Sequence, residues 1–269
     1  MNNTKRILSA IILIITLVGY YMNEQEEKNN QPVLDDATVV TATSDFDFLP
    51  TSTTKQIVNH NYYSLSYSEK DEQPEWVAYT LRKKDIVYTD FKRPYFIDDP
   101  KVQTKSASWK NYKKSGYDKG HLCPAADRKF SRKAFNETFY TSNISPQEHQ
   151  FNAGVWNRLE QKVRYWTKKY KQLYVVTGGV LTDSNLKKIG KERVTVPKYF
   201  YKVLLDYSKP EIKAIAFLIP HEESNKPLYK FVVSIDQLEK RTGIDFFPNL
   251  PDKLEKKLEA SNNYKNWSF

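Results

Sequence analysis

The feature that most constrains the fold is a helical stripe followed by several strand-like segments. Apolar residues recur at steps of four, four, three and four along Val155, Leu159, Val163, Trp166 and Tyr170. This spacing predicts one buried face of a helix that runs to about Tyr170. Three β-branched apolar segments follow, at residues 173–181, 194–205 and 212–219, and they are typical of central strands.

The rest of the chain adds strands before this helix and one helix after it. Residues 62–67 and 76–81 alternate and are rich in β-formers, so they predict a hairpin or meander. Residues 251–260 predict a closing helix. Ser145 to Glu148 fits a capping box and predicts a helix start there, although Gly154 also allows a short turn and a restart. We expect an α+β architecture with a central, mostly antiparallel sheet flanked by helices.

The N-terminal segment predicts export. Residues 1–22 carry Lys5 and Arg6 before an apolar run, which is the layout of a signal peptide. No clear cleavage site follows, so an uncleaved membrane anchor stays nearly as well supported as a cleaved signal. Residues 23–44 are acidic and polar and predict a linker, and residues 45–269 then form the folded domain. The expected location is secreted or periplasmic, or membrane-tethered if the signal remains.

Charge and cysteine content narrow the possible partners. The 269-residue chain carries 42 Lys and Arg against 32 Asp and Glu, a net charge of +10, which favours polyanions. Charge alone does not choose among nucleic acid, membrane and cell wall. The single cysteine, Cys123, excludes an intramolecular disulfide.

The chemistry concentrates in the segment Asp118-Lys119-Gly120-His121 and in polar residues downstream of it. These downstream residues are Asn143, Gln147, Asn152 and Glu160. Phosphodiester hydrolysis needs a base near neutral pH, a cation for the developing charge, and donors that hold the phosphate. His121, a metal on Asn152 and nearby cationic side chains could supply all three.

The spacing of the helix residues supports a metal site. On a continuous helix Asn152 and Glu160 lie roughly on one side, about 12 Å apart along the axis, so Glu160 could orient metal-bound water. A single amide is a weak ligand, but Mg²⁺ retains several waters and takes other ligands from substrate phosphate. The composition disfavours a zinc site at His121 and Cys123, because no further cysteine and no paired histidine completes it.

Together these residues resemble the DNA/RNA non-specific endonuclease family, which includes mitochondrial endonuclease G and whose signature is Asp-Arg-Gly-His. The resemblance runs from about Asp45 to the C-terminus. It implies a ββα-metal fold, with His121 at the end of one hairpin strand, Asn143 on the second strand and Asn152 on the following helix. It also implies that products carry 5′-phosphates and 3′-hydroxyls.

The resemblance assigns roles to particular residues. His121 would deprotonate the attacking water, Asn152 would bind Mg²⁺ directly, and Glu160 would hold the water shell. Arg93 and Lys119 would act on the phosphate charge. Asn143 and Gln147 are candidate substrate-binding residues, although each also has a structural interpretation, as do Asp118 and Asp127.

Two departures from the family pattern bear on rate rather than on reaction type. Lys119 stands where the family usually has Arg, which keeps the charge but loses the planar bidentate fork. Cys123 stands where a small residue such as Ala is usual. Neither change removes the base or the metal ligand.

The leading hypothesis is a divalent-metal-dependent endonuclease that acts on DNA and RNA, with Mg²⁺ as cofactor and Mn²⁺ or another divalent cation as alternatives. The second is a catalytically weak, surface-anchored nucleic-acid-binding protein on the same fold, and a phosphoester or cell-wall hydrolase is third. Family analogy allows a homodimer, but no sequence feature identifies an interface.

Overall fold

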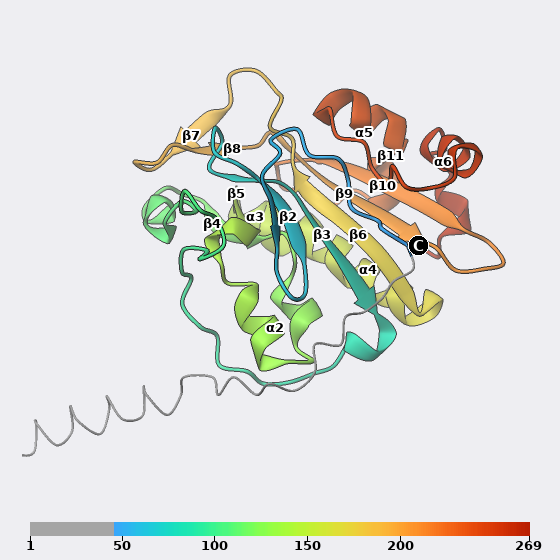
Figure 1. Ribbon diagram of the computed structural model, residues 1–269, viewed down its shortest axis with the longest axis horizontal. Coiled ribbons are helices and arrows are strands. Elements are labelled where there is room, and N and C mark those ends of the chain that lie inside the picture. The colour runs from blue at the N-terminus through green and yellow to red at the C-terminus, as the bar shows by residue number, and fades with distance from the viewer. Residues whose placement is uncertain (1–45) are drawn as a thin grey trace, which may run out of the picture. The chain divides into compact units, whose positions relative to one another are not determined.

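A seven-stranded sheet forms the centre of the computed structural model, which describes residues 46–269 (Figure 1). The strand order is β1-β2-β3-β6-β9-β10-β11, and each of these pairings is antiparallel. The strands are β1 (Ile57–Asn59), β2 (Ser64–Ser68), β3 (Gln73–Arg82), β6 (Gln172–Gly179), β9 (Tyr199–Asp206), β10 (Lys213–Pro220) and β11 (Val232–Val233). The predicted α+β class with an antiparallel central sheet is confirmed.

The two faces of the sheet bury different helices, because successive side chains of a strand point in opposite directions. Val77 and Tyr79 of β3 belong to the core that contains the apolar stripe of α4 (Asn157–Tyr170). Trp76 and Ala78 belong to the other core, which contains side chains of α5 (Ile235–Thr242) and α6 (Asp252–Glu259). The sheet is therefore a middle layer, with α4 on one face and α5 and α6 on the other.

A separate two-stranded hairpin precedes the long helix. Strand β4 (Asp118–His121) pairs antiparallel with β5 (Ile144–Gln147). Between the two strands lies α2 (Arg132–Glu137), and after β5 come α3 (His149–Phe151), a π-helical turn at Asn152–Trp156, and α4. This succession of two strands and a helix is the local arrangement that the resemblance implied. Asn143, however, was expected on the second strand and lies one residue before β5, at the end of the 3₁₀ turn Thr141–Asn143.

Shorter elements complete the described chain. A third small sheet pairs β7 (Lys187–Ile189) with β8 (Val194–Val196). The 3₁₀ turns are Lys83–Asp85, Trp109–Tyr112, Ala125–Arg128, Thr141–Asn143, Leu228–Phe231 and Tyr264–Asn266. The long region between β3 and β4 consists mainly of loop and short turns.

Two predictions about element boundaries were wrong. Ser145 and Pro146 lie on β5, so the capping box does not form, and the helix begins at His149 instead. The interruption that Gly154 allowed does occur, because Asn152–Trp156 forms a π-helical turn in which Gly154 has non-helical angles of φ −94° and ψ −108°. The segment 194–205 splits into β8 and β9 around Pro197, whose ring nitrogen cannot donate to a ladder.

The predicted signal peptide or anchor at residues 1–22 and the linker at 23–44 lie outside the described residues. Within residues 46–269, no helix is long and apolar enough to cross a membrane. Cys123 is buried with a free thiol.

Candidate active site

The β4–β5 hairpin fixes His121 through a close approach between its two strands. Gly120 lies opposite Ser145, and His121 lies opposite Ile144. A Cβ on Gly120 would lie 2.1 Å from Oε1 and 2.5 Å from Cγ of Gln147, far inside van der Waals contact. Only glycine therefore lets the buried Gln147 side chain cross β4 next to His121.

The imidazole of His121 is held between two phenylalanine rings. Its centroid lies 5.3 Å from that of Phe96 and 5.0 Å from that of Phe139, the latter edge-on. Its Nε2 atom is buried and has no hydrogen-bond partner within the described residues. Burial and then the nearby Arg93 charge lower the pKa of His121 to about 3, because both disfavour the protonated ring. The ring is thus a neutral imidazole with an available lone pair.

Two cationic side chains surround the same phenylalanines. The Arg93 guanidinium lies 5.7 Å from the Phe96 centroid and 5.3 Å from the Phe139 centroid. The Lys119 ammonium lies 5.4 Å from Phe96. Arg93 is exposed to solvent, so it remains free to bind an anion. The structure therefore brings together the three sequence-predicted residues Arg93, Lys119 and His121.

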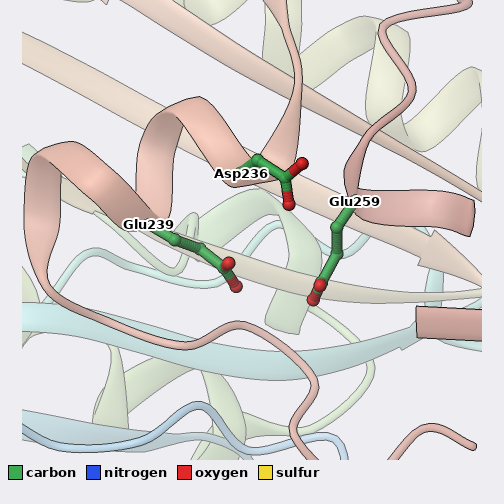
Figure 2. Close-up of side chains that lie close together, drawn as sticks. All are labelled: Asp236, Glu239 and Glu259. Carbon is green, nitrogen blue, oxygen red and sulfur yellow. The ribbon is translucent and has the colours of Figure 1, made fainter. Parts of the chain in front are cut away.

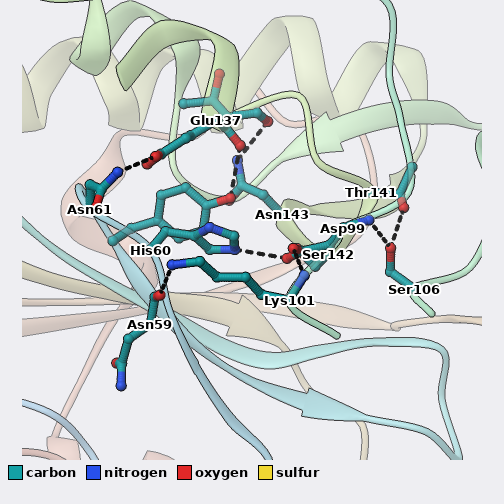
Figure 3. Close-up of polar contacts among 12 residues, drawn as sticks. Asn59, His60, Asn61, Asp99, Lys101, Ser106, Glu137, Thr141, Ser142 and Asn143 are labelled. Carbon is teal, nitrogen blue, oxygen red and sulfur yellow. Dashed lines mark hydrogen bonds and ion pairs between the residues drawn. The ribbon is translucent and has the colours of Figure 1, made fainter. Parts of the chain in front are cut away.

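Backbone and side-chain contacts tie the Arg93 loop to the turn before β5. Ile97 donates to the Phe139 carbonyl at 3.2 Å and accepts from the Thr141 amide at 2.9 Å. The adjacent Asp99 accepts a hydrogen bond from His60 Nε2 at 2.8 Å and another from the Ser142 hydroxyl (Figure 3). His60 is therefore structural, and the loop that carries Arg93 has a fixed anchor beside the hairpin.

Asn152 lies at the first position of the π-helical turn, and its amide is oriented by Asp118. Asn152 Nδ2 donates to Asp118 Oδ2 at 3.0 Å, and the same oxygen lies 3.0 Å from His149 Nδ1. A carboxylate accepts hydrogen bonds but does not donate them, so the amide nitrogen must face Asp118. The Asn152 carbonyl oxygen is consequently the atom left for a further ligand.

Glu160 belongs to a group of buried charged side chains that includes Lys202, Asp127 and Arg164. Burial raises the pKa of Glu160 to about 7, while burial lowers the pKa of Lys202 to about 8, and each charge opposes the shift of the other. Lys202 is fully buried and donates to Thr177 Oγ1 at 3.1 Å. Nearby, Arg164 binds Asp127 at 2.8 Å. Asp127 thus has the structural role that its sequence position suggested.

The structure buries both predicted substrate-binding residues completely. Asn143 accepts from the Cys123 amide at 2.8 Å and donates to the carbonyls of Cys123 and Thr138 at 3.0 and 2.9 Å. Gln147 has no exposed surface, and its side-chain amide has no hydrogen-bond partner among the described residues. Because neither side chain reaches the surface, direct contact with a substrate would require the hairpin to open. Their placement favours a role in holding the His121 segment.

Sequence reasoning missed two residues that position the site. Asp118 was given only a structural interpretation, yet it binds the side chain of Asn152. His221, which lies outside every motif, accepts from the Glu148 amide at 2.7 Å through Nε2 and contacts the Pro197 carbonyl through Nδ1 at 2.8 Å. It thereby fixes the start of α3. The motif position of Asp118 was a usable signal, but nothing near His221 in the sequence indicated its partner 73 residues earlier.

The arrangement of hairpin, π turn and helix agrees with the comparisons to known proteins. The family described as DNA/RNA non-specific endonuclease matches residues 47–253. The chain belongs to this family.

Several relatives combine substantial identity with long coverage. The chain is 39% identical over 202 residues to the mitochondrial nuclease EXOG of Danio rerio, covering 69% of this chain and 59% of that protein. It is 33% identical over 209 residues to mitochondrial endonuclease G of Homo sapiens, covering 72% of this chain and 70% of that one. The chain thus spans less than two thirds of the EXOG relative.

A solved structure shares the fold. The crystal structure of the EndoG/EndoGI complex superposes with a TM-score of 0.68 at 30% identity, covering 74% of this chain and 88% of that chain. This neighbour supports the ββα-metal nuclease fold, in which a mostly antiparallel sheet is flanked by helices.

The comparisons contradict the expected location. Residues 1–22 predicted a secreted, periplasmic or membrane-tethered protein, yet the relatives are mitochondrial nucleases, including that of Saccharomyces cerevisiae at 31% identity over 223 residues. A basic residue pair followed by an apolar run is a compositional pattern, and it did not distinguish between destinations in this case.

Proposed function

We propose that this protein is a divalent-metal-dependent endonuclease that hydrolyses phosphodiester bonds of DNA and RNA with little sequence preference. The proposal is supported most strongly by the presence of two functional groups on the same ββα unit. One is the neutral, unpartnered imidazole of His121 beside Arg93, and the other is the Asn152 amide oriented by Asp118. Catalytic function is assigned to residues 45–269.

His121 is the proposed general base. A base acts only in its unprotonated form, and the lowered pKa keeps the imidazole neutral at physiological pH. A phosphodiester placed beside Arg93 would bring a negative charge toward the ring, which raises the pKa toward the range where proton abstraction is efficient. The Phe96 and Phe139 rings restrict the orientation of the imidazole. The ring nitrogen would therefore accept the proton from one fixed direction.

The donor set at Asn152 fits a hard divalent cation. Its carbonyl oxygen is available because Asp118 holds the amide nitrogen, and amide oxygens are ligands for Mg²⁺, which keeps most of its own waters. Mg²⁺ is the proposed cofactor, with Mn²⁺ as an alternative. When bound, the cation would stabilise the charge on the phosphate and the leaving oxygen. Glu160 is proposed to accept hydrogen bonds from water next to that ion.

Arg93 and Lys119 are proposed to hold the scissile phosphate. The Arg93 guanidinium and the Lys119 ammonium lie over the rings that enclose His121. A phosphate bound by them would therefore be adjacent to the base. Contacts to phosphate carry no base information, which accounts for low sequence preference. The products would carry 5′-phosphates. Asn143 and Gln147 are proposed to position the hairpin rather than to contact substrate.

The test uses the full chain with supercoiled plasmid and with RNA, in Mg²⁺ or in EDTA. Wild type should cleave both polymers with Mg²⁺ and neither with EDTA, while Asn152→Ala should need more Mg²⁺ for the same rate. Lys168→Ala, which removes an exposed cation near the C-terminal end of α4, is the control and should cleave normally. A protein that shifts the plasmid on a gel but never nicks it with any divalent cation would instead be a nucleic-acid-binding protein.

A further inference from the structure

A group of five carboxylates lies on the face of the sheet opposite α4. Asp236 and Glu239 come from α5, Asp245 from the following loop, and Glu255 and Glu259 from α6. Oxygen atoms of Asp236, Glu239 and Glu259 lie within 4.8 Å of one another (Figure 2). Oxygen atoms of Asp245, Glu255 and Glu259 meet the same limit. Glu259 is thus common to both triads.

Glu259 is the residue that suggests a ligand. Its side chain is 7% exposed, and its Oε1 atom has no hydrogen-bond partner within residues 46–269. Figure 2 shows its carboxylate extending from the end of α6 toward those of Asp236 and Glu239. A buried carboxylate without a partner is costly, and natural sites of this kind pair it with a cation or a donor.

No Lys or Arg side chain of the described residues forms a salt bridge with these five carboxylates. Arg241 of α5 pairs with Asp183 instead, and only the charge of Lys256 acts on Glu255 from a distance. In the first triad, the Phe246 amide donates a hydrogen bond to Glu239 Oε1 at 2.8 Å. The group therefore keeps excess negative charge on a protein whose net charge is +10.

We propose that these carboxylates form a binding site for a divalent cation of the Ca²⁺ type, with Glu259 as the ligand common to both triads. Ca²⁺ takes six to eight oxygen ligands in flexible geometry and accepts carboxylates in one- or two-oxygen modes. The donor set is entirely oxygen, which disfavours zinc, whose sites use nitrogen and sulfur.

The position of the proposed Ca²⁺ site indicates that it acts on stability. It joins α5 to α6, which otherwise hold to the sheet through Leu238 and Leu258 in the shared core. The proposed active site lies on the hairpin and helix of the other face. Binding of Ca²⁺ at this place would therefore fix α6 against α5 and raise stability without entering the cleavage reaction.

The experiment measures the melting temperature of the full chain with CaCl₂ alone, up to about 5 mM. It is done in the Asn152→Ala background, so that the proposed catalytic ligand does not contribute. We expect a rise on the order of 5 °C at saturation. Glu259→Gln should abolish the rise, because a neutral amide replaces the carboxylate that both triads share. Glu223→Gln, an exposed loop acid, is the matched control and should retain the rise.

Glu255→Gln provides a second test if Glu259→Gln does not fold. It should weaken the response to Ca²⁺ at least tenfold in concentration and leave plasmid nicking by the otherwise wild-type chain unchanged. A melting temperature that does not respond to Ca²⁺ in the parent, or a response that survives in Glu259→Gln, would overturn the proposal.

Discussion

Replacing Gly120 with alanine tests how the catalytic hairpin is built. The new Cβ would lie 2.1 Å from Gln147 Oε1, 2.2 Å from Cδ and 2.5 Å from Cγ, whereas ordinary contact begins at 3.4 Å. Gln147 is fully buried, so it cannot rotate into solvent. The overlap must be relieved by shifting β4 against β5, and overpacking of this kind costs about 2 kcal/mol of the free energy of unfolding.

The companion change is Gln147→Ala, which removes all three atoms that the new methyl group would meet. Alone it should cost about 1 kcal/mol, because the lost packing is offset by removing two buried polar atoms that have no partner in the described chain. The double variant Gly120→Ala/Gln147→Ala should be more stable than Gly120→Ala, with a coupling energy of about 2 kcal/mol between the two positions.

The assay is urea unfolding followed by tryptophan fluorescence, with plasmid nicking measured on the same proteins. Gly120→Ala should also lose most of its activity, because β4 carries both Asp118 and His121, and the double variant should recover part of it. If the double variant loses as much stability as the two single variants together, the close approach of Gln147 to Gly120 does not explain the glycine.

Three further predictions concern the site residues. Asp118→Asn should raise the Mg²⁺ concentration for half-maximal cleavage by about tenfold or more, since residues that orient a ligand typically contribute that much; His149→Ala, which removes only the other contact of Asp118, should change it less. Arg93→Gln should move the acid limb of kcat/KM to higher pH, because Arg93 is one cause of the lowered His121 pKa and the base works only above its pKa; an unchanged or lower limb would contradict this. Asn143→Ala should lower the free energy of unfolding by about 3 kcal/mol, since it leaves the Cys123 amide and two carbonyls without their partner. If urea unfolding shows a loss below about 1 kcal/mol, water replaces these hydrogen bonds.

Much of the fold could be read from periodicity. The stripe from Val155 to Tyr170 is the buried face of α4, and the strands at 76–81, 173–181 and 212–219 correspond to β3, β6 and β10. These elements are long and pack on one core, so local pattern and tertiary contact agree. The capping box at Ser145 failed because β4 offers those residues a ladder that the local sequence does not reveal.

The site was predictable where a motif joined neighbouring residues, and not where contacts cross long stretches of chain. His121 and Asn152 were proposed from the Asp-Lys-Gly-His motif and from the family resemblance. The π-helical turn was not, because Gly154 indicates a break without specifying its form. The grouping of Arg93 with His121 depends on the Ile97 to Tyr140 bridge, and the acid cluster around Glu259 depends on packing of α5 against α6. Such contacts follow from tertiary structure alone.

The proposed role of His121 is to remove a proton in the rate-limiting cleavage of a phosphodiester. This role can be tested by the single-turnover cleavage rate of one end-labelled duplex by wild type and His121→Ala, with saturating protein and Mg²⁺. The rate should fall at least about a hundredfold in His121→Ala, while duplex affinity stays within a factor of about three. A His121→Ala protein that cleaves at close to the wild-type rate would show that His121 is not the general base.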